Sequence, residues 1–479
     1  MKELTPQIIA EITGGQYVGA EIDRNRPISG AVRDSHDVGP GNLFVCIRGA
    51  RVDGHIFANN AFDSGASCCL AEQRIPNAKG PYVIVSSTLE AILAVAGYHR
   101  SLFNIPIIGI TGSVGKTSAK EIIAAVLGIK LCVLKTEMNM NNELGAALTL
   151  LSLNAQHEAA VIEMGISKFG DMSILAEMVR PDIFVMTKIG YAHIEELGDL
   201  QGVLRAKTEA FAYMKPDGVA VLNGDDELLL KYDPKMRKIT FGQGKHNDVR
   251  AINIKTDGID SINFDIISDS GKFHATLLAY GSHLATLALA AVIIGQLLGL
   301  TDDEICTGLT AYAPVDGRSN VICVNDITII DDCYNASPNS VEAALESLSK
   351  LPGRHVAILG DMLNQGELST QRHCEIGAFA AKSGIDYLIC LGTQARHIYE
   401  SYVCVREARS MGISGKTAVK GMRSDEEEIA YFSSDMTELV KELPHKIKKG
   451  DTVLVKASRD MHFEGIVHFL SAKSENDYQ

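Results

Sequence analysis

The sequence has no excess of positive charge, and this limits the ligands that the protein can hold. It carries 45 Lys and Arg against 59 Asp and Glu, which gives a formal net charge of −14 at pH 7. A protein that binds nucleic acid through diffuse positive charge has the opposite balance. We therefore expect no nucleic-acid partner, and we expect any bound anion to be held by a local arrangement of residues.

The sequence also lacks a hydrophobic run long enough to cross a membrane. The longest apolar stretch, Leu284 to Leu300, contains Thr286 and Gln296 and falls short of the roughly 20 residues that a spanning helix needs. Glu3 and Pro6 interrupt the segment where a secretory signal would need a continuous apolar core. We expect this stretch to be a buried helix, and we expect a cytoplasmic protein without membrane insertion.

The ten cysteines show no C-x-x-C spacing, which is the spacing typical of zinc sites and thiol redox motifs. In a chain of this length without an export signal, cysteines are usually kept reduced. We therefore expect free thiols, with neither zinc nor disulfides. The chain also has no low-complexity segment and no repeat of fixed period.

The length of the chain, 479 residues with 46% hydrophobic positions, exceeds what one hydrophobic core can organise and indicates roughly three domains. In the middle of the chain, short continuous apolar runs alternate with amphipathic helices, which predicts a parallel sheet covered on both faces. From Val249 to Ala279 the apolar period changes to two, which predicts an antiparallel extension of that sheet. The expected parallel strands are Ile107–Ile110, Leu131–Leu134, Ala159–Ile162, Ile183–Met186 and Val219–Leu222.

The two flanking regions also combine strands with helices. The N-terminal region has helical stretches near Pro6 and Phe57, with strands expected at Gly30–Val32, Asn42–Ile47 and Tyr82–Ser86. The C-terminal strands are expected at Ile327–Ile330, His355–Leu359, Tyr387–Leu391 and Thr452–Val455. We predict an α/β protein of three domains: a small N-terminal α/β domain (1–104), a central domain with a parallel sheet (105–314) and a Rossmann-like α/β domain (315–479).

The sharpest local motif is T-G-S-V-G-K-T, which follows the strand ending at Ile110 and precedes an amphipathic helix. Its glycines let backbone amides surround a phosphate at the start of the helix, the lysine can reach the β- and γ-phosphates, and the threonine hydroxyl can reach Mg²⁺. The full pattern has Gly where this chain has Ile110, so a generic glycine turn is the alternative. The strand and helix context favours nucleotide binding by Thr111, Gly112, Ser113, Val114, Gly115, Lys116 and Thr117. We therefore predict that the central domain is a P-loop ATPase domain.

Two further residues are expected at the same edge of the sheet, because they follow buried parallel strands. Glu163 ends one strand, and its carboxylate could hold Mg²⁺ or could cap a helix. His193 follows another strand, and a lone histidine is more often structural than a ligand. Lys207 lies in an amphipathic helix and by itself would be a solvated lysine.

A series of short motifs runs through the whole chain in a fixed order, and together they resemble the ATP-dependent Mur ligases. The likeness covers nearly the full length and is strongest to the branch that adds D-alanyl-D-alanine. The motifs are D-S-H (34–36), P-G-N-L-F-V (40–45), D-G-H-x-F (53–57), T-G-S-V-G-K-T (111–117), N-M-N-N-E-L-G (139–145), E-M-G (163–165), A-H-I-E (192–195), A-K-T-E (206–209), L-N-G-D-D (222–226), G-R (317–318), I-D-D-C-Y-N-A-S-P-N-S (330–340), L-G-D-M (359–362) and K-A-S-R (456–459).

The resemblance implies an amide ligase that transfers the ATP γ-phosphate to a carboxylate and then lets an amine attack the acyl phosphate. The implied substrates are UDP-N-acetylmuramoyl-tripeptide, bound by the N-terminal domain, and D-alanyl-D-alanine, bound by the C-terminal domain. Two alternatives stay open: a related ligase for another acid or amine, and a paralogue that binds nucleotide or precursor without turnover. We expect a monomer.

The resemblance also assigns roles to residues. Lys116, Lys207, His193 and Arg318 are the implied catalytic residues. Thr117, Glu163, His193 and a carbamylated Lys207 are implied to hold Mg²⁺, with two ions expected. The remaining implied nucleotide contacts are Asn223, Arg318, Asp331 and Asp332, and the implied substrate contacts are Ser35, Asn141, Asn142, Ser458 and Arg459.

Several positions differ from the family pattern. His36 stands in place of an arginine in the N-terminal motif, and Leu284 and Leu287 replace two asparagines of a helix motif. The other differences are Met138, Lys188, Asn364, Gln365 and Ala457. The phosphate-binding part therefore follows the pattern more closely than the substrate-facing part does, and the sequence leaves open the third residue of the acceptor peptide.

Overall fold

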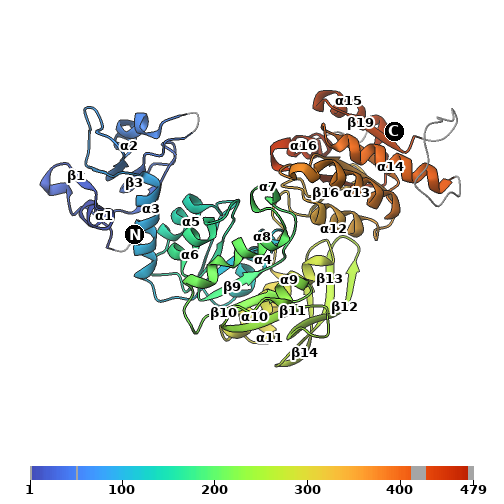
Figure 1. Cartoon of the computed structure of the whole chain (residues 1–479), viewed down its shortest axis with the longest axis horizontal. Helices are drawn as coiled ribbons and strands as arrows, with labels where there is room; N and C mark the ends of the chain where they lie inside the picture. Colours follow the sequence, from blue (N-terminus) through green and yellow to red (C-terminus); the bar gives the residue numbers. More distant parts are fainter. Residues whose placement is uncertain (1–2, 50–51, 411–427, 473–479) are drawn as a thin grey trace.

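The structure, a computed structural model, describes residues 3–49, 52–410 and 428–472. Its helices and strands form three α/β domains that follow one another along the chain (Figure 1). The predicted fold class is therefore confirmed. The expected domain limits at residues 104 and 314 fall in connecting segments, the first before strand β6 and the second before strand β15.

The N-terminal domain contains a five-stranded sheet in the order β1-β5-β4-β3-β2, in which only β1 runs antiparallel to its neighbour. Buried residues of helix α3, such as Val95, share one hydrophobic cluster with Leu150 and Leu175 of the central domain. The elements are α1 (Pro6–Thr13), β1 (Gln16–Val18), η1 (Glu21–Asp23), β2 (Gly30–Val32), β3 (Asn42–Val45), η2 (Gly54–Phe57), α2 (Ala58–Asp63), β4 (Cys68–Ala71), β5 (Tyr82–Ile84) and α3 (Thr88–Ser101).

The central domain contains a nine-stranded sheet in the order β14-β13-β12-β11-β10-β9-β6-β8-β7. The strand pairs from β7 to β12 are parallel, and β13 and β14 add an antiparallel extension, as predicted. The elements are β6 (Ile107–Thr111), α4 (Lys116–Leu127), β7 (Val133–Lys135), α5 (Glu143–Leu151), β8 (Ala159–Glu163), α6 (Asp171–Val179), β9 (Ile183–Met186), α7 (Ile194–Leu197), α8 (Leu200–Thr208), η3 (Glu209–Tyr213), β10 (Val219–Asn223), α9 (Glu227–Lys231), β11 (Arg237–Gly242), β12 (Val249–Asp257), β13 (Ser261–Ser268), β14 (Gly271–Leu277), α10 (His283–Leu297) and α11 (Asp302–Thr310).

The expected strand at Leu131–Leu134 is displaced in the structure, where β7 starts at Val133. This strand lies at the edge of the sheet and has β8 as its neighbour. Its pairing begins where Val133 meets Ala159, the first residue of β8. The two residues before Val133 therefore have no strand partner, although they continue the apolar run.

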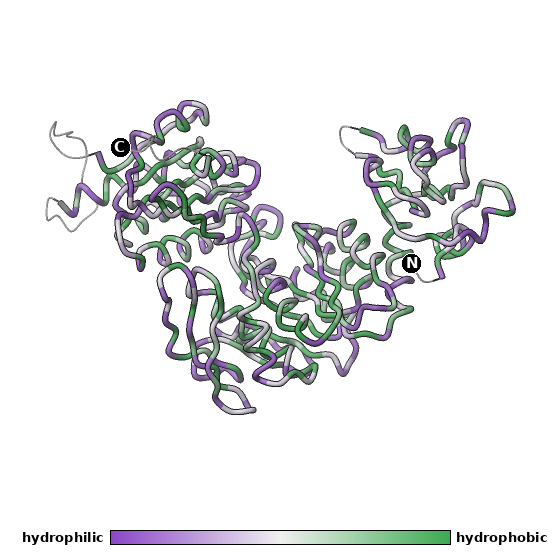
Figure 2. The backbone as a smooth tube through the Cα atoms, turned by 180° about the vertical axis from the view of Figure 1, so that it is seen from behind, coloured by the Kyte–Doolittle hydropathy of each residue, from purple (hydrophilic) through white to green (hydrophobic). Residues whose placement is uncertain are grey.

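The long apolar stretch forms helix α10, and eleven of its 15 residues are buried, which confirms the predicted buried helix. It joins α4, α11 and one face of the central sheet in a single hydrophobic cluster. No helix among the described residues is both long enough and apolar enough to cross a bilayer. Figure 2 shows the interior segments of the molecule mainly as hydrophobic, with hydrophilic stretches toward the outside.

The C-terminal domain contains a six-stranded sheet in the order β15-β16-β20-β17-β18-β19, in which only β15 is antiparallel. One hydrophobic cluster lies on each face of this sheet. The elements are β15 (Asn320–Val324), β16 (Ile327–Asp331), α12 (Pro338–Leu348), β17 (Arg354–Gly360), η4 (Gly366–Leu368), α13 (Ser369–Lys382), β18 (Tyr387–Leu391), α14 (Ala395–Ser410), β19 (Ala430–Ser433), α15 (Met436–Lys446), β20 (Asp451–Lys456), η5 (Arg459–Met461) and α16 (Glu464–Ala472).

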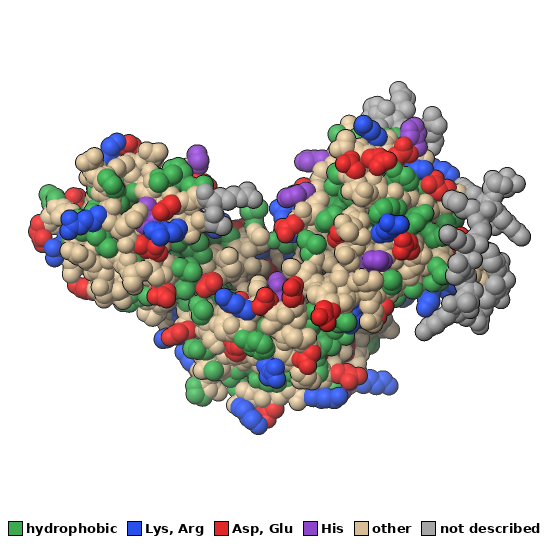
Figure 3. Space-filling view, turned by 45° about the horizontal axis from the view of Figure 1, so that its top comes forward, with side chains coloured by type: hydrophobic (Ala, Val, Ile, Leu, Met, Phe, Trp, Pro, Cys, Tyr) green, Lys and Arg blue, Asp and Glu red, His purple; other side chains and the backbone are tan. Residues whose placement is uncertain are grey.

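The N-terminal and C-terminal domains form two lobes with a hollow between them, and the central domain lies at its base (Figure 3). A cavity between the central and C-terminal domains is lined by the loop after β6, the segment after β9, the start of α12 and the segment after β20. These linings follow the carboxyl ends of parallel strands, where open α/β sheets bind their ligands.

Candidate active site

The loop between β6 and α4 has the backbone geometry of a phosphate cradle. Gly112 and Gly115 have φ values of 152° and 83°, in a range that residues with a Cβ atom rarely adopt. A Cβ atom at Gly112 would collide with the Thr187 hydroxyl, and one at Gly115 would lie 2.9 Å from Leu287. The loop therefore requires glycine at both positions, and residues 113–118, at the start of α4, line the cavity, as an anion site at a helix N-terminus requires.

A neighbouring segment after β9 holds this loop in place. The backbone amide of Ser113 donates to Lys188 O over 2.8 Å, and the Thr187 hydroxyl donates to Val114 O over 2.5 Å. Asn223 supports the segment in turn, since its amide donates to Thr187 O over 2.7 Å. Asn223 is buried and does not line the cavity, so a direct contact with nucleotide stays a prediction.

Three polar side chains meet at the start of α4. Lys116 Nζ donates to Gly112 O over 2.8 Å, and Arg318 Nη2 of the C-terminal domain donates to Thr117 Oγ1 over 3.4 Å. Burial lowers the pKa of Lys116, Glu163 opposes that shift, and Arg318 adds to it. The Arg318 Nε atom is buried without a hydrogen-bond partner among the described residues. Lys116 and Arg318 both line the cavity, so two cations face a space suited to phosphate oxygens.

Glu163, at the end of β8, has only 1% of its surface exposed. Its Oε1 atom accepts from Asn141 Nδ2 over 2.8 Å, whereas Oε2 has no hydrogen-bond partner in the described part of the chain. The nearest cation to Oε2 is Lys120 Nζ, at 3.9 Å. A buried carboxylate oxygen without a hydrogen bond needs a cation, and Mg²⁺ is bound through such oxygens. Glu163 therefore fits a magnesium ligand.

Lys207 and His193 lie close to the same group of charges. Lys207, in helix α8, is 3% exposed, and its pKa is held well below the usual value by burial first and by Lys116 second. His193 is half-buried, and burial, Lys116 and Lys207 lower its pKa. The structure thus brings together Lys116, Glu163, His193 and Lys207 from separate elements. Within the described ranges no three His, Cys, Asp or Glu side chains form a complete metal site, so oxygens from other sources would have to complete one.

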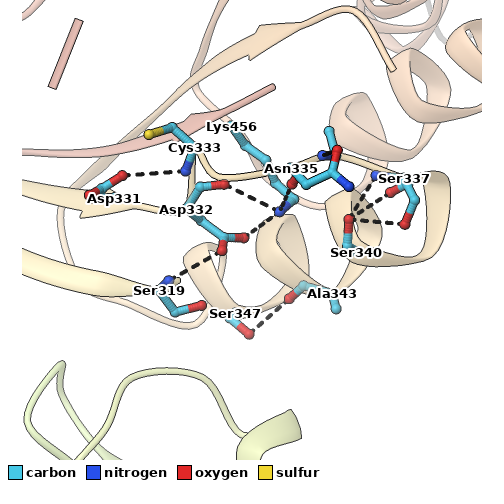
Figure 4. A network of polar contacts seen from close by, with 11 residues as sticks. Ser319, Asp331, Asp332, Cys333, Asn335, Ser337, Ser340, Ala343, Ser347 and Lys456 are labelled. Carbon is cyan, nitrogen blue, oxygen red and sulfur yellow. Dashed lines mark hydrogen bonds and ion pairs between the residues drawn. The ribbon is translucent and has the colours of Figure 1, made fainter. Parts of the chain in front are cut away.

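The C-terminal wall of the cavity contains an ion pair between Asp332 and Lys456 (Figure 4). Lys456 Nζ lies 2.5 Å from Asp332 Oδ2 and also donates to Asn335 O over 3.0 Å. Asp331 lies behind this wall, where its carboxylate accepts from the backbone amides of Gly317 and Cys333. Asp332 lines the cavity and Asp331 does not, so a ribose contact by either residue stays a prediction.

The K-A-S-R segment places Ser458 and Arg459 at the cavity. Ser458 is buried, and its hydroxyl accepts from Leu363 N over 2.8 Å, which ties this segment to the loop that carries Asn364. Arg459 is exposed at the cavity surface. Ala457 is fully buried, and a Cβ atom at Gly360 would come within 2.6 Å of it. The alanine at this position therefore faces the core rather than a substrate.

The other expected substrate residues lie apart from the cavity. Ser35 is half-buried in a turn of the N-terminal domain, and none of the described residues that line the cavity comes from that domain. Asn142 caps helix α5, because its Oδ1 atom accepts from Gly145 N over 2.8 Å. Their roles in substrate binding stay predictions.

The two leucines that differ from the family pattern have separate positions. Leu287 lines the cavity and packs against Gly115, whereas Leu284 lies in the hydrophobic cluster beneath and does not reach the cavity.

Sequence reasoning missed two residues beside the cavity. Lys120 is fully buried, and its Nζ atom donates to Thr136 O over 2.6 Å. Its position four residues after Lys116, one helical turn away on the same face of α4, was a usable signal. Tyr334 lies within 4.0 Å of the Arg318 guanidinium, measured to the ring centroid. It lies inside the I-D-D-C-Y-N motif, 16 residues after its partner Arg318.

Comparison with known proteins extends over the whole chain. Residues 27–98 match the family model described as Mur ligase family, catalytic domain; residues 110–295 match the Mur ligase middle domain; and residues 317–459 match the glutamate ligase domain of Mur ligases. A similar curated protein is UDP-N-acetylmuramoyl-tripeptide--D-alanyl-D-alanine ligase of Bacillus subtilis (strain 168), which is 32% identical over 98% of both chains. The protein of that name from Escherichia coli (strain K12) is 32% identical over 83% of this chain and 88% of its own.

Solved structures agree with these matches. MurF from Acinetobacter baumannii superposes with a TM-score of 0.86 at 27% identity, covering 98% of this chain and 99% of its own. The MurF ligase from Thermotoga maritima in complex with ADP gives a TM-score of 0.79 at 28% identity, covering 94% of this chain and 97% of its own. Sequence and structure lead to the same conclusion: the chain belongs to the Mur ligase family.

Proposed function

We propose that the protein is an ADP-forming, ATP-dependent ligase that joins D-alanyl-D-alanine to UDP-N-acetylmuramoyl-tripeptide in the synthesis of peptidoglycan precursors in the cytoplasm. One observation carries this proposal: relatives named UDP-N-acetylmuramoyl-tripeptide--D-alanyl-D-alanine ligase match nearly the full length of the chain. The Bacillus subtilis relative matches over 98% of both sequences. Lys116, His193 and Arg318 line one cavity, and the charges of the buried residues Glu163 and Lys207 lie near Lys116. This arrangement supports the proposal, because phosphoryl transfer depends on positioning and charge neutralisation.

Different residues at and near the cavity bind the phosphates and the metal ions during phosphoryl transfer. The loop amides and Lys116 hold the β- and γ-phosphates of ATP, and Arg318 reaches the same phosphates from the C-terminal domain. Thr117 and Glu163 would hold one Mg²⁺, and His193 and a carbamylated Lys207 would contribute to a second. When bound, Mg²⁺ neutralises negative charge on the phosphate oxygens.

The reaction then follows from the substrates. A carboxylate oxygen of the tripeptide attacks the γ-phosphorus, the bond to ADP breaks, and an acyl phosphate forms. The amine of D-alanyl-D-alanine attacks the acyl carbon, inorganic phosphate leaves, and the nitrogen gives up a proton. Exclusion of water between the central and C-terminal domains protects the acyl phosphate from hydrolysis.

Product formation tests the whole proposal. The protein is incubated with ATP, Mg²⁺, UDP-N-acetylmuramoyl-tripeptide and a panel of dipeptides and amino acids, and the products are weighed by mass spectrometry. We expect the D-alanyl-D-alanine adduct together with one ADP per adduct. An adduct with a different amine alone would replace the proposal by a related ligase, and nucleotide binding without any adduct would replace it by a binding protein.

We also propose that the chain acts as a monomer. Light scattering on the same preparation would measure its molar mass.

Arg459 is expected to bind the carboxylate of the incoming dipeptide. It is exposed at the cavity surface, and its planar guanidinium can pair with both carboxylate oxygens. Arg459→Ala should raise the KM for D-alanyl-D-alanine far more than that for ATP. The increase should correspond to a loss of binding free energy of about 1.5 to 3 kcal/mol, the usual range for a hydrogen bond to a charged group. Steady-state kinetics with each substrate varied in turn measures this difference.

The matched control is Arg396→Ala, which removes an exposed arginine that pairs with Glu400 on helix α14 of the same domain. This control should leave both KM values unchanged. If Arg459→Ala changes the two KM values equally, or changes neither, the dipeptide carboxylate is bound elsewhere.

A further inference from the structure

Tyr334 is the common neighbour of two arginines at the cavity. The Arg318 guanidinium lies 4.0 Å and the Arg459 guanidinium 5.1 Å from the centroid of its ring. Both distances are within the range in which a cation is attracted to an aromatic face. The two cations are therefore no farther apart than these two distances combined, although they come from segments more than a hundred residues apart in the chain.

The backbone that carries Tyr334 is tied to the turn that carries Arg318. Tyr334 N donates to Gly317 O over 3.1 Å, and Gly317 N donates to Asp331 Oδ2 over 2.9 Å. The amide of Ser319, on the other side of Arg318, donates to Asp332 Oδ1 over 3.2 Å. Three hydrogen bonds thus fix the turn and the ring relative to each other.

The same wall is anchored to the segment that carries Arg459. Lys456, three residues before Arg459, pairs with Asp332 and donates to Asn335 O (Figure 4). Asp332 and Asn335 lie on either side of Tyr334 in the sequence. Lys456 itself is 3% exposed, and its ion pair is shielded from solvent. The ring therefore has a defined position toward both arginines.

The hydroxyl end of Tyr334 reaches the central domain. The side chain of Asn139 hydrogen bonds to it, and burial raises the pKa of the hydroxyl, so the ring stays neutral. A neutral ring attracts guanidinium groups, and each stacked arginine loses rotational freedom that it would otherwise keep until a ligand binds. Without the ring, the two guanidinium groups would still repel each other, and neither would be held in one orientation by an aromatic face.

We propose that Tyr334 is a positioning residue, which aims Arg318 at the nucleotide phosphates and Arg459 at the carboxylate of the incoming amine. This inference rests on the proposed function for its Arg459 half, and its Arg318 half requires only that the cavity binds a nucleotide. The same aromatic ring would thereby position one arginine for the nucleotide and one for the amine substrate.

The first test compares Tyr334→Leu with Tyr334→Phe. Loss of the ring in Tyr334→Leu should weaken the binding of a non-hydrolysable ATP analogue, and raise the KM for D-alanyl-D-alanine, each by about 5- to 30-fold. Tyr334→Phe keeps the ring and should stay within about threefold of wild type in both measurements. If the leucine variant does not fold, as judged by thermal unfolding, Tyr334→Met takes its place in every measurement. Equal losses in the phenylalanine and leucine variants would overturn the proposal, because the hydroxyl would then be responsible.

The second test separates positioning from general damage. In a double-mutant cycle, Tyr334→Leu should cause little further loss of nucleotide affinity when Arg318 is already alanine. It should likewise cause little further increase in the KM for the dipeptide when Arg459 is already alanine. Additive effects in both cycles would mean that Tyr334 does not act through the arginines. The nucleotide arm needs no acceptor, so it stays decisive even if the chain proves to have no ligase activity.

Discussion

Replacement of Lys116 by alanine is expected to lower the rate of product formation by about 100- to 1,000-fold, the usual cost of losing one electrostatic donor at a transferring group. The side chain lies at the start of α4 with its amine on Gly112 O, and no hydrophobic contact of the core depends on it. The fold should therefore be retained. Steady-state rates, together with circular dichroism and thermal unfolding of the same samples, measure both outcomes.

Lys130→Ala is the matched control, because this exposed lysine follows the far end of the same helix and pairs there with Glu304. It should keep the wild-type rate. A near-normal rate for the Lys116 variant would show that the loop after β6 does not hold the transferring phosphate.

Replacement of Lys207 by alanine should also remove most of the activity, because we expect its amine to carry a carbamate in the working enzyme. Only a neutral amine reacts with CO₂, and burial together with the charge of Lys116 holds the pKa of Lys207 well below its usual value. At neutral pH this lysine therefore has a larger neutral fraction than a solvated lysine has. Carbamylation would turn the buried amine into an anion close to Lys116 and His193.

Two measurements separate a carbamate from a simple structural role. Protein equilibrated with ¹³C-labelled bicarbonate near pH 7 should show a carbamate carbon signal in NMR spectra that is absent from Lys207→Ala. A short carboxylic acid should return part of the activity of that variant by supplying the missing anion. The control is Arg205→Ala, an exposed cation on the same helix, which should behave as wild type. Full activity of Lys207→Ala without the carbamate signal in wild type would contradict the assignment.

The α/β class, the parallel central sheet and the buried helix α10 could all be predicted from the amino-acid sequence. These features depend on local patterns: continuous apolar runs of four or five residues, a period-two stretch, and an apolar segment too long for a strand and too short for a membrane. The phosphate loop belongs to the same group, because Gly112 and Gly115 have to adopt conformations that a short motif already specifies.

The partner of each polar side chain, in contrast, depends on how the domains fold and meet. Asp331 and Asp332 are adjacent in sequence, yet one holds the backbone of Gly317 and the other pairs with Lys456 at the cavity. Tyr334 meets Arg318 and Arg459 through contacts that no motif spacing encodes. A backbone pattern follows from neighbours along the chain, whereas the partner of a polar group is set by which strand ends the fold brings to one edge. That is why the sheet edge that carries the cavity could be predicted from sequence, whereas the partners of Asp331, Asp332 and Tyr334 could not.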